Sequence, residues 1–253
     1  MKNPRYIIIT GASSGIGAEL ARQYSAPGIV LGLLGRDSAR LQQIAAECSE
    51  KGAIVDIAAI NIADDASLTH WINGFQRIDL VIANAGISGG TAEGIDDEAV
   101  REIFSTNIWG ALNTVLAAIN KMKAQPAIQG SKGQIAIMSS VAGLRGLPSS
   151  PAYSASKAAM MAYGDALRGS MRREQIDVSV IAPGYVRTPL TDQNNFFMPF
   201  ITSVEKAAGK IKNGLSKNRK RIYFPFIMYG LVRTLAAMPH TVTDPLFRIL
   251  PKK

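Results

Sequence analysis

Residues Tyr6–Gly17 read YIIITGASSGIG, and this stretch places the chain among the α/β folds. Its first five residues are apolar or β-branched, and the run is too short for a typical helix, so it predicts a buried strand over Tyr6–Thr10. The glycines that follow open a helical pattern over Gly15–Tyr24. A buried strand that passes through a glycine turn into a helix predicts a βαβ unit and therefore a parallel sheet.

The rest of the chain continues this alternation. Short apolar runs bounded by Gly, Asp or Asn predict further strands at Ile29–Leu34, Ile54–Ile60, Leu80–Ala83, Gln134–Met138 and Val178–Ala182. Apolar residues at three- and four-residue spacing predict helices at Ser38–Lys51, Ala66–Phe75, Asp96–Lys123 and Tyr153–Arg173. We therefore expect a doubly wound parallel sheet of the Rossmann type, with about seven strands and helices on both faces.

The composition predicts one domain over residues 1–253. Hydrophobic residues make up 47% of the chain and charged residues 19%, a balance that supports a substantial core. The single cysteine, Cys48, cannot form an internal disulfide, and no Cys/His cluster has the spacing of a zinc site, so no metal is expected. No export signal precedes the first strand, and we expect a cytoplasmic protein.

The turn Gly11–Gly17 has the spacing G-x-x-x-G-x-G at the first strand-to-helix junction. Glycines let the backbone approach a diphosphate, and the free N–H groups and dipole of a helix N-terminus favour its negative charge. A plain tight turn has the same residues, but the position on the first junction favours dinucleotide binding. The predicted contacts in this turn are Gly11, Ser13, Ser14, Gly15, Ile16 and Gly17.

The second strand ends in Gly35-Arg36-Asp37, where a Rossmann protein contacts the adenosine ribose. A guanidinium pairs with a 2′-phosphate, whereas a carboxylate accepts from a 2′-hydroxyl. Arg36 comes first after the strand, with Ser13 and Ser14 as further donors, so we predict NADP(H) in preference to NAD(H). Alternatively, Arg36 is a solvated residue at a helix start, with the neighbouring Asp37 as its N-cap. If Asp37 is the ribose ligand, the cofactor preference reverses.

Tyr153 and Lys157 lie four residues apart in a predicted helix and so project from one face. An adjacent ammonium favours the phenolate, which would lower the pKa of Tyr153 from about 10 and make it an acid/base residue. Such a pair is by itself more typical of packing beside a solvated charge than of catalysis. Ser140, however, follows the strand Gln134–Met138 at the carboxyl edge of the sheet, where its hydroxyl could hold a substrate oxygen.

Together these residues resemble the short-chain dehydrogenase/reductase family over roughly residues 5–190. The resemblance rests on the glycine turn, Asn84-Ala85-Gly86, Asn107, Ser139-Ser140, Tyr153-x-x-x-Lys157 and Pro183-Gly184, all in the family's order and spacing. It implies a catalytic tetrad of Asn107, Ser140, Tyr153 and Lys157. In reduction, the nicotinamide would deliver hydride to a carbonyl carbon, while Tyr153 would protonate the oxygen and Ser140 would hydrogen-bond it.

The resemblance also implies the remaining roles. Lys157 would bind the nicotinamide ribose, and Asn107 would hold a water that links Lys157 to solvent. Ser140 is preferred to Ser139 because the family has the same thirteen-residue interval to the tyrosine. Further cofactor contacts are implied at Asn61, Ile62, Asn84, Ala85, Gly86, Tyr153, Lys157, Pro183, Gly184, Val186 and Thr188. Ala83 and Asn61 depart from the family pattern by losing polar contacts, and neither belongs to the tetrad.

Beyond Thr188 the resemblance fades and the charge changes. Residues 1–200 hold 17 basic and 17 acidic side chains, whereas the last 53 residues hold 11 basic and 2 acidic ones, so the net charge of +9 is local to the tail. Asn194–Phe200 is predicted to form a flap over an apolar substrate. Lys217–Arg221 is basic and leads into an apolar run, Ile222–Val232, that is too short for a membrane span.

Three interpretations of residues 217–253 remain open. The first is a seventh strand at Arg221–Phe224 followed by a packed helix, with solvated cations. The second is a peripheral surface at the inner face of a membrane, with cations at anionic headgroups and aromatic side chains at the boundary. The third is nucleic-acid binding, which no recognised motif supports, so no nucleic acid is expected.

We therefore expect an NADP(H)-dependent oxidoreductase that interconverts a carbonyl and a secondary alcohol on a lipophilic small molecule. The alternative is a non-catalytic NADP(H)-binding or membrane-tethered scaffold, which the intact tetrad argues against. Relatives usually pair through the helices equivalent to Asp96–Lys123 and Tyr153–Arg173, so a homodimer or homotetramer is expected.

Overall fold

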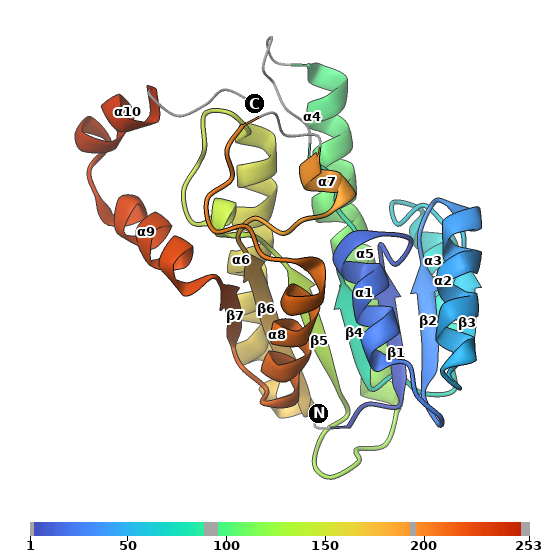
Figure 1. Cartoon of the computed structure of the whole chain (residues 1–253). Coiled ribbons are helices and arrows are strands. Elements are labelled where there is room, and N and C mark those ends of the chain that lie inside the picture. The colour runs from blue at the N-terminus through green and yellow to red at the C-terminus, as the bar shows by residue number, and fades with distance from the viewer. Residues whose placement is uncertain (1–2, 89–95, 193–195, 249–253) are drawn as a thin grey trace.

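A computed structural model describes residues 3–88, 96–192 and 196–248. Its centre is a parallel sheet in the order β3-β2-β1-β4-β5-β6-β7 (Figure 1). The strands are β1 Tyr6–Thr10, β2 Val30–Leu34, β3 Ile54–Ala58, β4 Leu80–Ala83, β5 Gly133–Met138, β6 Ile176–Pro183 and β7 Arg221–Phe224. The predicted Rossmann-type sheet is confirmed, although the third strand ends at Ala58 and not at Ile60.

Helices cover both faces of this sheet (Figure 1). One face carries α1 (Gly15–Tyr24), α2 (Ser38–Glu50) and α8 (Val204–Ser216), and the other carries α3 (Asp65–Gly74), α5 (Ala111–Ala124) and α6 (Pro151–Ser170). The sequence did not predict α8, because two glycines and small alanines weaken its apolar pattern. A hydrophobic core lies on each face of the sheet, and alternate residues of β1 point into one or the other. Ile7 and Ile9 face α1 and α8, whereas Ile8 faces α3 and α5.

The long helix predicted over Asp96–Lys123 is interrupted by a π-helical turn. Helix α4 (Asp97–Phe104) and helix α5 are joined through the π-helical residues Ser105–Gly110. A π turn holds one more residue per turn than an α-helix, so it redirects side chains, and such turns are frequent at functional sites. Here the turn contains Asn107, whose side chain is buried.

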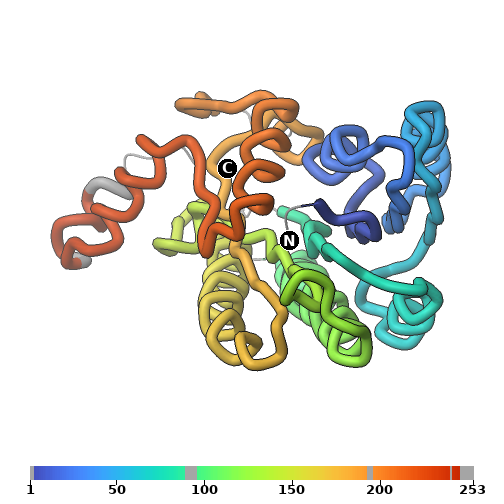
Figure 2. Tube along the Cα trace, turned by 90° about the horizontal axis from the view of Figure 1, so that it is seen from below, coloured from blue at the N-terminus to red at the C-terminus, as the bar shows by residue number. Residues whose placement is uncertain are grey.

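The end of the chain leaves the sheet at its β7 edge. Strand β7 matches the seventh strand expected at Arg221–Phe224 and leads into α9 (Phe226–Ala237) and α10 (His240–Arg248). These two helices project from the rest of the molecule in both views (Figures 1 and 2). The basic residues 217–220 precede β7 and α9 follows it, so the cations and the apolar helix lie at opposite ends of one strand.

No helix among the residues that the structure describes is both long and apolar enough to cross a bilayer. Parts of two predicted segments, residues 194–195 of the flap and 249–253 of the tail, lie outside the described residues.

Candidate active site

A cavity of about 880 Å³ opens at the carboxyl edge of the sheet. It lies where β1 pairs with both β2 and β4, the point at which the strand order reverses and doubly wound folds bind ligands. The cavity extends from Arg36 past the glycine turn to Tyr153 and on to α9. Every predicted cofactor and catalytic residue lines it except Gly17 and Asn107, which lie directly behind its wall.

The glycine turn has contacts that no larger residue would allow. Gly11 has a φ of +65°, and a Cβ at this position would lie 2.8 Å from the Cα of Ala85. A Cβ on Gly17 would lie 2.7 Å from Nδ2 of Asn84 and closer still to the carbonyl oxygen of Gly11. The turn therefore holds the N-terminus of α1 tightly against the end of β4, and the backbone between these glycines faces the cavity.

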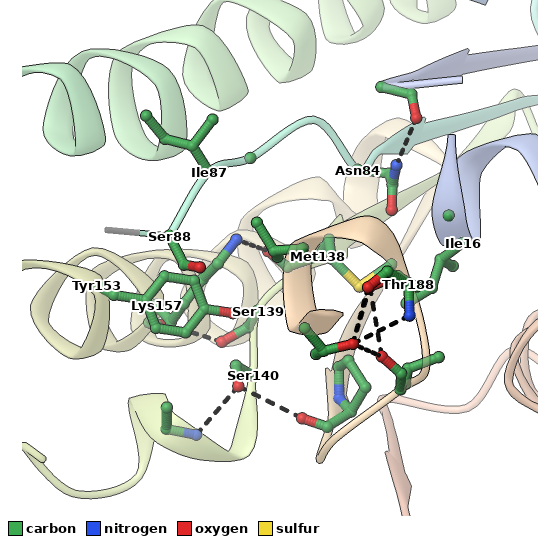
Figure 3. Close-up of a pocket in the computed structure, with 18 of the residues that line it drawn as sticks. Ile16, Asn84, Ile87, Ser88, Met138, Ser139, Ser140, Tyr153, Lys157 and Thr188 are labelled. Atoms are coloured by element: carbon green, nitrogen blue, oxygen red, sulfur yellow. Dashed lines mark hydrogen bonds between the residues drawn. The ribbon is translucent and has the colours of Figure 1, made fainter. Parts of the chain in front are cut away.

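Asn84 ties β4 to this turn (Figure 3). Its Nδ2 donates to the carbonyl oxygens of Thr10 (2.9 Å) and Gly11 (3.2 Å). The backbone N–H groups of Asn84 and Ala85 both donate to Oγ1 of Thr10, each at 3.1 Å. Because the Asn84 side chain is used in this way, it fixes the position of Ala85 and Gly86 along the cavity wall.

At the far end, the cavity has two guanidinium groups where the sequence predicted one. Arg36 is 63% exposed and contacts Glu102 at 3.3 Å, an exposed pair that contributes little stability. Asp37 is the N-cap of α2: its carboxylate accepts from the backbone N–H of Arg40 at 3.0 Å and pairs with the Arg40 side chain at 3.2 Å. Arg40 was missed because only the folding of α2 brings it to the cavity.

Asn61 and Ile62 line the same end of the cavity. The Oδ1 of Asn61 accepts from the backbone N–H of Ala63 at 3.0 Å, and Ile62 is buried. The amide of Asn61 therefore shapes the loop after β3, and an adenine at this position would meet the edge of that loop.

Ser140, Tyr153 and Lys157 converge from two elements (Figure 3). Ser140 follows β5 and caps the 3₁₀ turn Val141–Gly143, with its Oγ accepting from the backbone N–H of Ala142 at 3.1 Å. Tyr153 and Lys157 project from the first turns of α6, which begins at Pro151 and not at Tyr153. Nζ of Lys157 lies 5.6 Å from the centroid of the Tyr153 ring and donates to the carbonyl oxygen of Met138 at 3.3 Å.

Ser139, the residue before Ser140, makes a different contact. The Oγ of Ser139 donates to the carbonyl oxygen of Lys157 at 2.7 Å, a fully buried contact that joins the end of β5 to α6. The Oγ of Ser140 instead donates to the carbonyl oxygen of Pro183 at 3.4 Å, and Ser140 lines the cavity together with Tyr153. The choice of Ser140 as the catalytic serine stays a prediction.

Asn107 lies behind Gly86, next to Lys157. Its Oδ1 accepts from the backbone N–H of Ile87 at 2.8 Å, and its Nδ2 donates to the carbonyl oxygen of Ile87 at 2.9 Å and to Oγ of Ser156 at 3.1 Å. A Cβ on Gly86 would lie 3.0 Å from Oδ1 of Asn107 and 3.2 Å from Nζ of Lys157. Asn107 thus fixes the loop after β4, and its water-holding role stays a prediction.

This arrangement falls within a segment that a known family matches. The family described as short chain dehydrogenase matches residues 5–197. The chain belongs to the short-chain dehydrogenase family. The resemblance inferred from the motifs is thereby confirmed, and the protein is an oxidoreductase of a family that uses a nicotinamide nucleotide.

Relatives of this short-chain dehydrogenase match it along nearly its whole length. An uncharacterized oxidoreductase of Myxococcus xanthus is 32% identical over 251 residues, which are 97% of each chain. A short-chain dehydrogenase from Sphingobium yanoikuyae in complex with NADPH matches with a TM-score of 0.79 and 23% identity, over 98% of this chain and 96% of that one. A short chain dehydrogenase/reductase from Burkholderia phymatum in complex with NAD matches with a TM-score of 0.82 and 20% identity, over 97% and 95%. Both structures confirm the fold, and they hold different nucleotides.

Burial controls the protonation of the two central side chains of this short-chain dehydrogenase. It raises the pKa of the Tyr153 phenol, and the hydrogen bond with Ser140 only partly opposes that rise. It lowers the pKa of the Lys157 ammonium to about 8. The predicted lowering of the Tyr153 pKa is therefore not seen in this arrangement, because burial is the largest effect on the phenol and the neighbouring Tyr185 adds to the rise. Tyr153 carries its proton at neutral pH.

We expect the substitution Lys157→Met to stabilise the fold at neutral pH. Burying the ammonium lowers its pKa from 10.5 to about 8, so below pH 8 the folded state bears the whole cost, on the order of 3 kcal/mol. Between these values the unfolded state binds more protons, and the stability of the wild type rises with pH. Urea unfolding at several pH values measures the difference, which should be largest near pH 7 and shrink toward pH 10.

The control for this prediction is Lys217→Met, which removes an exposed ammonium. Its effect on the free energy of unfolding should show no such trend with pH. A Lys157→Met variant that is less stable than the wild type at pH 7 would mean that the bond from Lys157 to Met138 outweighs the desolvation of the charge.

The segment Pro183–Thr188 lies over the glycine turn of this dehydrogenase. A Cβ on Gly15 would lie 3.2 Å from Cγ2 of Thr188, so the two segments are in contact. Val186 is buried, and its carbonyl oxygen accepts from Oγ1 of Thr191 at 2.7 Å. The predicted contact residues Pro183, Gly184, Val186 and Thr188 all face the cavity.

The end of the cavity beyond Tyr153 is largely apolar. Helix α9 contributes Met228, Leu231, Val232 and Leu235, and the predicted flap contributes Phe196 and Pro199. One cation, Arg145, also lines this end. Neither α9 nor Arg145 was predicted to reach the site, because both lie outside the family's motifs and are brought there only by the course of the chain.

Proposed function

We propose that this short-chain dehydrogenase is an NADP(H)-dependent carbonyl reductase or alcohol dehydrogenase for a lipophilic substrate, with Tyr153 as its acid/base residue. The observation that carries the proposal is the placement of Tyr153, Ser140 and Lys157 in one cavity that continues from the glycine turn to an apolar end. Consumption of NADPH with medium- and long-chain ketones tests it directly, and the absence of binding of either nucleotide would overturn it.

The residues present fit a dinucleotide. The absence of side chains at Gly11 and Gly15 leaves the backbone open toward the cavity, and the N-terminus of α1 favours a diphosphate there. Lys157 would bind the nicotinamide ribose, and Val186 and Thr188 would contact the carboxamide. When bound, the nicotinamide supplies a hydride acceptor or donor for the substrate carbon.

The protein itself supplies a proton and a position for the substrate oxygen. Burial keeps Tyr153 protonated at neutral pH, so its hydroxyl is ready to donate to a carbonyl oxygen as negative charge develops. Ser140, which lines the cavity beside Tyr153, would donate to the same oxygen. The Lys157 ammonium, with a pKa near 8, would favour the phenolate left behind and return a proton to it.

The preference for NADP(H) is supported by the two guanidinium groups at the adenosine end. Arg36 and Arg40 both line the cavity there, whereas the carboxylate of Asp37 is engaged as the N-cap of α2 and by the Arg40 side chain. Two guanidiniums match the charge and geometry of a 2′-phosphate.

The substitutions Arg36→Ala and Arg40→Ala should each weaken NADPH binding by about 10- to 100-fold, because each removes charge-assisted hydrogen bonds. The affinity for NADH should stay within about threefold of the wild type, since NADH has no 2′-phosphate to lose. Fluorescence titration with both nucleotides measures this, with Arg173→Ala, an exposed cation outside the cavity, as the control. Equal losses for NADPH and NADH would contradict the assignment.

The lipophilic substrate is supported by the apolar end of the cavity, where α9 and the flap supply aliphatic and aromatic side chains.

A homodimer or homotetramer is supported by Trp109 and Leu116, which are 64% and 49% exposed on the outer side of the π turn and α5.

Peripheral membrane contact through residues 217–253 stays a prediction. The exposed side chains of Phe226 and Ile227 favour membrane contact. The position of the cations disfavours it, because β7 separates them from α9.

A non-catalytic nucleotide-binding scaffold is the alternative function. No described residue of the tetrad is missing or turned away from the site, which disfavours it. NADPH binding without turnover of any ketone or alcohol would support the scaffold.

A further inference from the structure

The C-terminal arm, which we define as α9 and α10, is attached to the body at its base. Tyr229 of α9 stacks on Tyr223 of β7 with ring centroids 3.8 Å apart and planes at 11°. Met228 is buried against Gly184, and its sulfur fills the space that a side chain there would need. These contacts hold the first turn of α9 against the sheet edge.

A second attachment lies at the far end of the arm. Nη2 of Arg145 donates to Oγ1 of Thr243 on α10 at 2.6 Å and lies 3.9 Å from Oδ1 of Asp244. Thr243 is fully buried, and the side chain of Arg145 is only 12% exposed. A short charge-assisted hydrogen bond between groups withdrawn from water is among the stronger single contacts in a protein.

Arg145 connects this contact to the catalytic loop. It lies on the segment that joins the 3₁₀ turn Val141–Gly143 to α6, so Ser140 precedes it and Tyr153 follows it on the same stretch of chain. Arg145 and Ser140 also line the same cavity. The loop that presents the substrate-binding hydroxyl is thus joined directly to α10.

Between its two attachments, the arm bounds the cavity with one face. Met228, Leu231, Val232 and Leu235 line the apolar end, at the three- and four-residue spacing of a single helix face. The opposite face is largely uncovered: Phe226, Ile227 and Val242 are 72%, 62% and 51% exposed. Burial of this face therefore does little to hold the arm in place. Among the described residues, α9 also contacts the 3₁₀ turn Val141–Gly143, and the Arg145 contact joins α10 to the loop after that turn.

We propose that Arg145 is a positioning residue that holds the C-terminal arm closed over the substrate end of the cavity through Thr243, so that α9 selects substrates with a large apolar group. This inference rests on the proposed function and identifies the part of the substrate that the arm recognises, which is the portion remote from the carbonyl. The guanidinium is bound by α10, so it serves the arm and does not recognise an acidic substrate.

The test compares Thr243→Val with Thr243→Ser. Valine has the shape of threonine but no acceptor for Arg145, whereas serine keeps the hydroxyl. The first readout needs no substrate: amide hydrogen exchange over residues 226–248 should become about tenfold faster or more in Thr243→Val and stay near the wild type in Thr243→Ser. Unchanged NADPH affinity in both variants shows that the remainder of the protein is folded.

The second readout uses methyl ketones whose alkyl chain grows from ethyl to decyl. In Thr243→Val, KM for the decyl ketone should rise about tenfold, because the apolar wall is no longer held, while kcat and KM for the ethyl ketone stay unchanged. Thr243→Ser should restore the wild-type values.

Two outcomes would overturn the proposal. Unchanged exchange over 226–248 in Thr243→Val would mean that the Arg145 contact does not hold the arm. Faster exchange with the same KM for every chain length would mean that the arm does not select the substrate. If the wild type binds NADPH but reduces no ketone, the proposed function fails, and the exchange measurement still decides whether Arg145 holds the arm.

Discussion

The substitution Tyr153→Phe is expected to lower kcat for ketone reduction by about 10²- to 10⁴-fold, the usual contribution of a positioned general acid. Phenylalanine keeps the ring but removes the hydroxyl whose pKa burial raises. NADPH should still bind, because the glycine turn, Arg36 and Arg40 are untouched. Stopped-flow or steady-state NADPH consumption measures the loss, and fluorescence titration measures the binding.

Tyr185→Phe provides the matched control for this prediction. Tyr185 lines the same cavity and its pKa is also raised by burial, but it lies on the segment after β6 and not on α6. Its hydroxyl should be dispensable to within about threefold in kcat. If Tyr185→Phe loses as much activity as Tyr153→Phe, or if Tyr153→Phe retains full turnover, the acid/base residue has been misassigned.

The substitution Gly17→Ala should abolish nucleotide binding at any practical concentration, with a loss of about 100-fold or more in affinity. A Cβ at this position would lie 2.7 Å from Nδ2 of Asn84 and even closer to the carbonyl oxygen of Gly11. Neither group can move freely, because Asn84 is hydrogen-bonded to Thr10 and Gly11 is backbone. The turn must therefore shift away from α1, which displaces the backbone that faces the diphosphate.

The same clash should lower stability by about 1–3 kcal/mol, as overpacking typically does. Gly169→Ala is the control: it lies in α6, and a Cβ there would have nothing within 4 Å. This variant should be neutral or stabilised by up to about 1 kcal/mol, because alanine favours the helix. Full NADPH affinity in Gly17→Ala would show that the turn adapts and that its contacts with Asn84 are not required.

The strands and the glycine turn could be predicted because their signals are local. Each strand of the sheet is a short apolar run with turn residues at its ends. Such a run is too short to form a typical helix, so a strand is the structure it predicts. The boundary errors are small, as at β3, which ends at Ala58. Helix α8 was not predicted because small residues, Ala207, Ala208 and Gly214, make up much of its buried face beside Ile211 and Leu215, and its glycines resemble turn signals.

The site was predictable only where a motif or a resemblance covered it. Tyr153, Lys157 and Ser140 have suggestive spacing, whereas nothing local distinguishes Asn107 from any other helical asparagine. The π-helical turn that contains Asn107 has no recognised sequence signal. Arg40 was not predicted because it lies one turn into α2, and only the folding of that helix brings it to the cavity.

The sheet and the glycine turn follow from the sequence, because they depend on short-range patterns of apolar and small residues, whereas the tetrad needed the family resemblance. The protonation of Tyr153 and Lys157 and the contact of Arg145 with Thr243, which are 98 positions apart, follow only from the tertiary structure. These features have one cause in common. Desolvation and hydrogen bonding depend on which distant groups exclude water from a side chain, and no local pattern contains that information.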